Sequence, residues 1–353
     1  MMPNTLKRLL RIKIILILIA LLLSAEILVR ITCPNPYEIE YPHFWETNFQ
    51  YDSYYGWVSK SNFIVDLKPF GFENIVIDHR GFPIIPDIKN DRIENEKKIL
   101  FIGRCDTFGG PMIGSEKSFM GLLARETGAR LDIDSIGVSG YTFYQEYLLN
   151  QQHNHGGNDL VIVSFCPQFD FYLDTKFFMY SLGNRLVPHP QVKDGRLTHK
   201  LVPYVKSYWE ANLPEGERFS LKEKVLLNNY LLSKIISKVI KKKSFDVDLT
   251  NHILKELKKD VENKGGRLAL LVFNWCPDKQ EPFLTKVTDE FITWLIQNNV
   301  GVIDVRRKLV GYSLAKMGDP THVSVDGQKI MKEEILSYLN KTGFLVDTGG
   351  GSL

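Results

Sequence analysis

A cysteine between two charged residues stands directly after a short apolar run. The run Ile99–Ile102 is followed by Gly103 and then by Arg104, Cys105 and Asp106. A buried parallel strand has such an apolar run, and open α/β sheets carry their chemistry just beyond the carboxyl ends of their strands. Because a deprotonated thiol is a nucleophile and a metal ligand, Cys105 is the first candidate for chemistry in this chain.

An aspartate and a histidine with the pattern Asp-x-x-His form the second candidate. Gly318-Asp319-Pro-Thr-His322-Val-Ser-Val-Asp-Gly327 follows the fifth predicted strand and leads into the last predicted helix, Val325–Leu339. A pattern this short also occurs in a helix-capping loop that carries a surface histidine. Its position after a strand favours a functional Asp319–His322 pair.

The elements that must position these residues alternate from Lys98 onward. The predicted strands are Lys98–Ile102, Leu131–Ile136, Leu160–Phe165, Leu268–Phe273 and Val302–Val305. The predicted helices are Ser118–Glu126, Tyr144–Gln152, Asn251–Lys264, Thr288–Asn298 and Val325–Leu339. This alternation predicts an α/β fold, a flavodoxin-like parallel sheet of about five strands with helices on both faces, in strand order 2-1-3-4-5. Residues 174–245 interrupt the rhythm, and we expect an insertion or lid over the C-terminal edge of the sheet.

Several of these segments resemble the motifs of the SGNH (GDSL-type) hydrolases. Gly103 to Gly109 aligns with the motif Gly-Asp-Ser-x-Thr-x-Gly, with Arg104 in the aspartate position and Cys105 in the position of the nucleophilic serine. Gly137 matches the second motif, whose backbone N–H binds the oxyanion. In the third motif Asp170 matches, but Phe169 replaces the oxyanion-binding asparagine.

The resemblance implies a role for each matched residue. Cys105 would be the nucleophile and His322 the general base, oriented by Asp319. Arg104 beside the thiol would favour the thiolate. Gln168 would be a substitute oxyanion donor for the missing asparagine. The residues expected to line the site are Arg104, Asp106, Gly137, Gln168 and Asp170.

Two functions remain open at this point. One is an esterase or O-acyltransferase that acts on acyl groups of envelope polysaccharide. The other is a non-catalytic carbohydrate-binding or scaffolding protein of surface-polysaccharide biosynthesis that retains the cleft. The polysaccharide context comes from Tyr51–Trp57 and Asp78–Pro83, which resemble segments of membrane-anchored SGNH-like proteins in bacterial surface-polysaccharide systems. As structure, we expect irregular loops that pack aromatic side chains onto the main domain.

The four cysteines allow a further alternative. None has CxxC spacing, so a structural zinc site is not expected, and we expect no metal and no cofactor. Cys105 and Cys166 follow neighbouring predicted strands, where a disulfide would block the nucleophile. A metal site made of these thiols and His322 is the remaining alternative.

The N-terminus predicts a membrane anchor. Basic residues precede the apolar stretch Ile14–Val29, which we interpret as an uncleaved single-pass helix with a cytoplasmic N-terminus and an extracytoplasmic domain. A cleaved signal peptide is the competing interpretation. The expected organisation is an anchor in 1–33, a membrane-proximal aromatic segment in 34–95, the α/β domain in 96–343 and a flexible tail in 344–353. A net charge of +3 over 353 residues argues against a nucleic-acid partner, so the expected partners are the membrane and an acylated carbohydrate.

Overall fold

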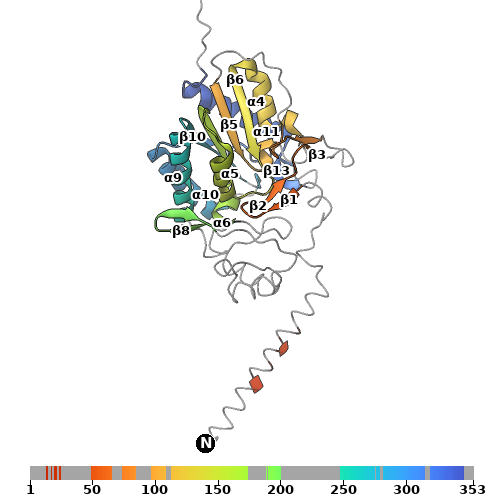
Figure 1. Ribbon diagram of the computed structural model, residues 1–353, viewed down its shortest axis with the longest axis vertical. Helices are drawn as coiled ribbons and strands as arrows, with labels where there is room; N and C mark the ends of the chain where they lie inside the picture. The colour runs from red at the N-terminus through yellow and green to blue at the C-terminus, as the bar shows by residue number, and fades with distance from the viewer. Residues whose placement is uncertain are drawn as a thin grey trace, which may run out of the picture.

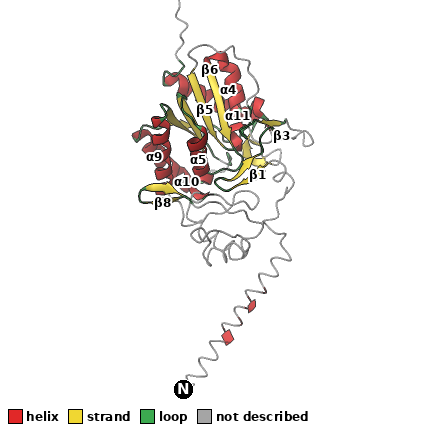
Figure 2. Ribbon diagram, in the orientation of Figure 1, coloured by secondary structure: helices red, strands yellow, loops and turns green. Residues whose placement is uncertain are grey.

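The computed structural model describes residues 49–65, 74–84, 97–108, 113–173, 190–199, 247–274, 276–278, 281–314 and 319–345, with a few isolated positions besides. Figure 2 shows these parts by secondary structure.

A five-stranded parallel sheet forms the centre of the described structure (Figure 1). Its strands are β5 (Lys97–Gly103), β6 (Leu131–Gly137), β7 (Leu160–Phe165), β10 (Arg267–Val272) and β11 (Gly301–Asp304). They lie in the order β11-β10-β7-β5-β6, and every neighbouring pair is parallel. Counted along the chain this order is 2-1-3-4-5, so the predicted α/β class and strand order are confirmed.

Helices cover both faces of the sheet. On one face lie α5 (Phe143–His153), α9 (Val247–Asn263) and α10 (Pro282–Gln297), and on the other lie α4 (Phe119–Thr127) and α11 (Val325–Lys341). The sequence predicted all five, with ends that differ by a few residues, apart from α10, which begins six residues before its predicted start at Thr288.

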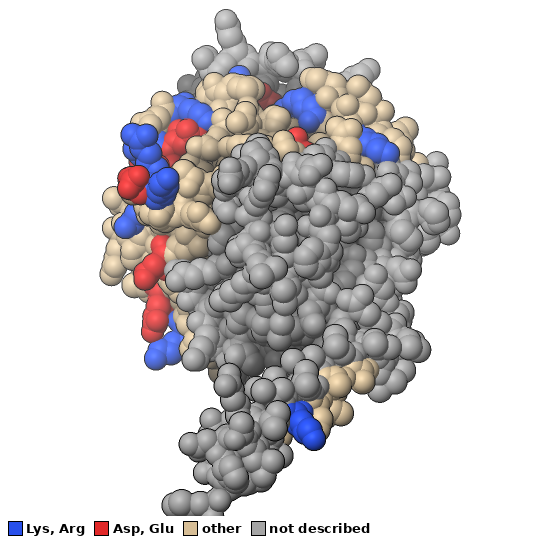
Figure 3. All heavy atoms as spheres, turned by 60° about the horizontal axis from the view of Figure 1, so that its bottom comes forward, with Lys and Arg blue, Asp and Glu red and all other residues tan. Residues whose placement is uncertain are grey.

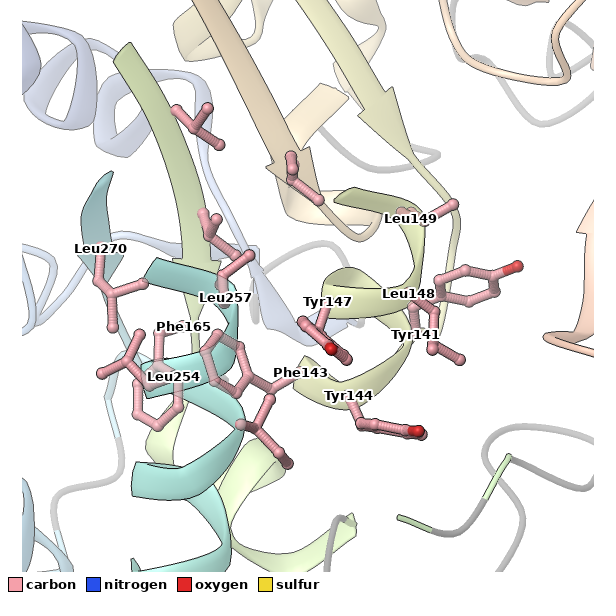
Figure 4. Packing of buried hydrophobic residues seen from close by; sticks show 14 of the residues in the cluster. Tyr141, Phe143, Tyr144, Tyr147, Leu148, Leu149, Phe165, Leu254, Leu257 and Leu270 are labelled. Carbon is pink, nitrogen blue, oxygen red and sulfur yellow. The ribbon is translucent and has the colours of Figure 1, made fainter. Parts of the chain in front are cut away.

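Alternate residues of the strands build two separate cores. Leu100 and Ile102 of β5 face the layer of α5, α9 and α10, whereas Ile99 and Phe101 face α4 and α11. All four are at most 2% exposed, which is why the strand reads as an unbroken apolar run rather than as an alternating one. Figure 4 shows the first core, where aromatic and leucine side chains of α5 and α9 pack on the sheet.

The aromatic segment before the sheet is more regular than expected. It forms two antiparallel hairpins, β1 (Phe49–Asp52) with β2 (Gly56–Ser59) and β3 (Phe63–Val65) with β4 (Ile75–Ile77). The expectation of irregular loops was therefore wrong for Tyr51–Trp57, where short strands pair, whereas Asp78–Pro83 is an irregular turn as expected. Its aromatic side chains do pack onto the main domain, as those of Phe49, Trp57 and Phe82 belong to the first core.

Two predicted features fall largely outside the described residues. The apolar stretch Ile14–Val29 is one of them, and among the residues that the structure does describe, no helix has the length and apolar character needed to cross a membrane. The other is the insertion, of which mainly the hairpin of β8 (Gln191–Lys193) and β9 (Arg196–Thr198) is described. On the described part of the face in Figure 3, basic and acidic side chains are interspersed.

Candidate active site

The thiol of Cys105 is held at the carboxyl end of β5 by a tight turn. Gly103 ends the strand, and Cys105 opens the 3₁₀ helix η2 (Cys105–Phe108), whose turn is closed by a 2.9 Å hydrogen bond from Thr107 N to Arg104 O. A Cβ atom on Gly103 would lie 2.0 Å from Thr107 Oγ1 and 2.4 Å from Ser164 Oγ. Only glycine therefore lets η2 fold back against the strand ends, and Cys105 is fixed there with 7% exposure.

His322 is presented by a short strand that leads into the last helix. It belongs to β13 (Asp319–Val323), which pairs with β12 (Ser313–Leu314). Ser324 then caps α11, since its side-chain oxygen accepts a 3.3 Å hydrogen bond from Gly327 N. The spacing His-x-Ser-x-x-Gly thus has a local cause: the serine caps the helix, and the glycine lets the first turn pass Val323 closely.

These two elements bring a thiol and an imidazole together. His322 Nε2 lies 3.2 Å from Cys105 Sγ, although the residues are 217 positions apart in the chain. A hydrogen bond of 2.9 Å from Phe119 N to Gln328 Oε1 ties the start of α4 to the first turn of α11. Because α4 follows the Cys105 segment and α11 follows His322, this link joins the two halves of the pair.

Arg104 does not lie where we expected it. We predicted that it lines the site and favours the thiolate, but its side chain is 0% exposed and is directed to two buried carboxylates. Its Nη2 donates to Asp170 Oδ2 at 2.6 Å, and its Nε lies 3.4 Å from Glu146 Oε1. Burial opposes the charged guanidinium, yet these carboxylates raise the pKa of Arg104 well above its usual value. The positive charge is therefore neutralised inside the protein.

Asp170 is likewise a buried residue rather than a lining one. It is 0% exposed, and its Oδ2 also accepts a 2.6 Å hydrogen bond from Cys166 N. Burial raises the pKa of Asp170, against the opposing effect of Arg104. Asp170 lies in α6 (Pro167–Leu173), so the Arg104–Asp170 pair ties the turn after β5 to the turn after β7. Glu146, Arg104 and Asp170 form what we call the buried ion cluster.

Glu146 was missed by the sequence reasoning. It lies in α5, is 0% exposed, and accepts a 3.3 Å hydrogen bond from Ser164 Oγ. The sequence did contain a signal for it, because Glu146 is the single acidic residue in the otherwise uncharged run Phe143–Asn150. In the structure every residue of this run is buried. A charge on a buried helix face needs a partner, and the cation after β5 was the available one.

The other predicted site residues occupy different places. Gly137 ends β6 and pairs in register with Gly103. Asp106 directly follows Cys105 and is 6% exposed. Gln168 Oε1 accepts a 3.2 Å hydrogen bond from Cys276 N, which fixes its amide in α6. The backbone of Asp319 lies in β13, and its side chain is outside the described part, so its role toward His322 stays a prediction.

The aromatic segment supports the loop after Gly137. Asp52 Oδ1 accepts hydrogen bonds of 2.8 and 2.7 Å from Tyr54 N and Tyr55 N, closing the β1–β2 turn. The indole of Trp57 then donates to Ser139 O at 3.2 Å. The Tyr51–Trp57 segment therefore builds a hairpin that holds the backbone just beyond Gly137.

A second contact from the same segment reaches β6 itself. Asp78 closes the turn that follows β4, since its Oδ1 accepts hydrogen bonds from Arg80 N and Phe82 N. The Arg80 guanidinium makes two hydrogen bonds, of 2.7 and 2.8 Å, to the Asp134 carboxylate. Both segments singled out in the sequence thus attach to the second strand of the sheet and its loop.

None of the three described cysteines forms a disulfide. Cys105 and Cys166 are buried, and Cys276 is partly exposed. The alternative of a Cys105–Cys166 bridge is therefore not what the structure shows, and the sulfur of Cys105 is available for chemistry.

Comparisons with known proteins gave structural matches only. No family model matches the chain, and no curated protein matches it either. A protein assigned to the G-D-S-L lipolytic family from Desulfitobacterium hafniense matches with a TM-score of 0.41 and 14% identity, covering 69% of this chain and 100% of that one.

Two further matches are of the same kind. The lipase/acylhydrolase of Enterococcus faecalis matches with a TM-score of 0.40 and 11% identity over 70% of this chain and 96% of that one. The esterase EstA of a Pseudoalteromonas species matches with a TM-score of 0.38 and 15% identity over 70% and 100%. Because these TM-scores and sequence identities are low, the matches do not establish a function, and any functional argument must come from the residues of this chain.

Proposed function

We propose that this chain is a membrane-anchored, SGNH-like esterase or O-acyltransferase that uses a cysteine nucleophile and acts on acyl groups of envelope polysaccharide. The observation that carries the proposal is the 3.2 Å separation of Cys105 Sγ and His322 Nε2. A nucleophile within hydrogen-bond reach of a base is the minimal arrangement for covalent acyl transfer. The polysaccharide substrate comes from the sequence resemblance alone, and the anchor comes from the apolar stretch Ile14–Val29 and the basic residues before it.

The reaction follows from these two side chains. His322 Nε2 takes the thiol proton of Cys105 as Sγ attacks the acyl carbonyl carbon, giving a tetrahedral oxyanion. The oxyanion collapses, the C–O bond to the sugar breaks, and His322 returns the proton to the leaving sugar oxygen. The product of this half-reaction is a thioester on Cys105.

The second half-reaction regenerates the thiol. Water, for an esterase, or an acceptor hydroxyl, for a transferase, loses its proton to His322 and attacks the thioester carbonyl. The C–S bond breaks, and the sulfur recovers the proton from His322. The backbone N–H of Gly137 is our candidate for binding the oxyanion, by the resemblance of its segment to the second family motif.

Removal of the nucleophile tests the proposal. The purified full chain is incubated with p-nitrophenyl acetate and with an acetylated oligosaccharide, and intact mass spectrometry follows acetylation of the protein. We expect an acetyl thioester on Cys105 that is absent from Cys105→Ala, and a rate loss of about 10²–10⁴-fold in His322→Ala. Cys276→Ser, which removes a thiol outside the pair, serves as the control.

One outcome would favour the non-catalytic alternative. If the wild-type chain forms no acyl adduct, or if Cys105→Ala turns over either ester as fast as the wild type, the catalytic proposal fails. Binding of the same oligosaccharide without turnover would then support a carbohydrate-binding protein.

A further inference from the structure

Three side chains of different chemical types converge at the candidate nucleophile. One ligand atom each from Cys105, Asp106 and His322 lies within 4.8 Å of the other two. Cys105 and Asp106 are buried, and His322 is half-buried. From this arrangement we propose that the thiol, the carboxylate and the imidazole form a binding site for a thiophilic divalent cation such as Zn²⁺, and that the bound metal blocks the nucleophile.

The separations fit tetrahedral coordination. Zn–S bonds of about 2.3 Å and Zn–N bonds of about 2.0 Å at a tetrahedral angle place sulfur and nitrogen about 3.5 Å apart. The observed Sγ–Nε2 separation is 3.2 Å, within a few tenths of an ångström of this value, and the Asp106 carboxylate oxygen lies within 4.8 Å of both atoms. Three protein ligands also leave the fourth position for water, as in open zinc sites.

The charges of the ligands suit a divalent cation. A thiolate and a carboxylate carry one negative charge each and a neutral imidazole carries none, so the set with Zn²⁺ is neutral. A neutral set is what a largely buried position favours, because an uncompensated charge is costly there. Metal binding releases the thiol proton of Cys105 to water, and no other bond changes.

The nearest cation in the sequence does not oppose the metal. Arg104 directly precedes the ligands, but its guanidinium is paired with Asp170 and lies near Glu146. Its charge is therefore balanced away from the site. The turn that begins at Gly103 fixes the backbone of Cys105 and Asp106, so the two ligands need little ordering when the metal binds.

The mixture of donors selects the metal. Sulfur and nitrogen ligands favour Zn²⁺ over Mg²⁺, which prefers oxygen ligands and octahedral geometry. Binding of the metal does not depend on whether the protein is an enzyme. Only the statement that the bound metal inhibits rests on the proposed function.

Metal titration of the full chain tests binding. The chelator-treated protein is titrated with Zn²⁺ against a chromophoric chelator, and with Co²⁺ while the near-ultraviolet thiolate-to-cobalt charge-transfer band is recorded. We expect one Zn²⁺ per chain, the cobalt band, and no competition by Mg²⁺. Cys276→Ser, which keeps all three ligands, should behave as the wild type.

Variants of the ligands decide the assignment. Cys105→Ser should lose the cobalt band. Asp106→Asn and His322→Gln should each weaken Zn²⁺ binding by about tenfold or more, because losing a ligand costs at least as much affinity as losing a residue that supports a ligand. Thermal melting of the metal-free variants checks that each is folded. Less than one Zn²⁺ per chain in the wild type, or a cobalt band that persists in Cys105→Ser, would overturn the inference.

A second readout separates this inference from the proposed function. Stoichiometric Zn²⁺ should abolish both iodoacetamide alkylation of Cys105 and acyl transfer. If Zn²⁺ binds and protects Cys105 but the metal-free protein transfers no acyl group, the proposed function fails and the metal site stands. If acyl transfer proceeds unchanged with stoichiometric Zn²⁺, the metal inference fails alone.

Discussion

The guanidinium carbon of Arg104 lies 4.9 Å from the centre of the Phe169 ring. By the resemblance described above, Arg104 and Phe169 stand where the aligned motifs have an aspartate and an asparagine. The departures are therefore coupled: the arginine is stacked on the aromatic ring and paired with Asp170. A cation–π contact of this kind stabilises by about 0.5–2 kcal/mol. The altered motif is a packed structural arrangement and not a set of unrelated losses.

Removal of Arg104 should strongly destabilise the fold. Arg104→Met leaves Asp170 and Glu146 as buried carboxylates without their cation, and breaking a buried pair in this way costs about 3–5 kcal/mol. The free energy of unfolding, measured in urea, should fall by that amount. Arg80→Met is the control, because Arg80 and Asp134 are 35% and 46% exposed and such a pair contributes at most about 1 kcal/mol. Equal losses in the two variants would contradict the assigned role of the buried ion cluster.

Exchange of the nucleophile should not restore a serine esterase. Cys105→Ser recreates the serine of the motif, but a hydroxyl is much harder to deprotonate than a thiol, and Phe169 still offers no hydrogen bond to an oxyanion, a loss that costs about 10²–10³-fold in rate. We expect p-nitrophenyl acetate turnover at least about tenfold below that of the wild type. The double variant Cys105→Ser, Phe169→Asn supplies the comparison. A single serine variant as fast as the wild type would show that the site does not depend on the thiol.

A methyl group at Gly327 should displace His322 from the thiol. The Cβ of Gly327→Ala would lie 2.2 Å from Val323 Cγ1, next to His322. Such overpacking costs about 1–3 kcal/mol, and alkylation of Cys105 should change with it. Val323→Ala removes the clashing methyl groups, so the double variant should be more stable than additivity of the two single changes predicts. Strict additivity in chemical denaturation would rule out the clash.

Two histidines should make the fold less stable as the pH falls. Burial lowers the pKa of His199, which is hydrogen-bonded to Tyr144 at 2.9 Å, and burial together with His155 lowers the pKa of His153. With folded values below the ordinary 6.5, both favour the fold in their neutral form. The contribution of these two histidines to the free energy of unfolding is present above the pKa of the unfolded chain. It is lost as the pH falls through the lower pKa of the folded protein.

The melting temperature should therefore drop more steeply below about pH 6.5 in the wild type than in His199→Gln. Exposed His79 provides the control, because His79→Gln should keep the wild-type slope. A His199→Gln profile that runs parallel to the wild type would contradict the prediction.

Deletion of residues 2–30 should release the protein from membranes. The stretch Ile14–Val29 is our proposed anchor, and the α/β domain follows it. In bacterial expression the full chain should sediment with membranes, and an alkaline phosphatase fused after Leu353 should be active, which requires export. The shortened chain should be found in the soluble fraction of the cytoplasm. If only a fusion to a cytoplasmic reporter is active at the same position, and the alkaline phosphatase fusion is not, the proposed topology is reversed.

The sequence alone determined the layered architecture. Unbroken apolar runs such as Leu160–Phe165 become strands buried on both faces, and the helical periods between them require a parallel sheet. The strand order 2-1-3-4-5 was expected because it is the usual one for a flavodoxin-like sheet. Cys105 and His322 were recognisable for a related reason: each stands beyond the end of an element, at a position marked by a glycine or a capping serine.

The tertiary structure decided the direction in which the polar side chains point. Arg104 precedes the candidate nucleophile in the chain, yet its side chain turns inward because Asp170 and Glu146 reach it from α6 and α5. No local pattern encodes that choice, since the three residues are far apart in sequence and pair only after the sheet has assembled. A buried charge must take the partner that the packing supplies, and that partner is set by the whole fold.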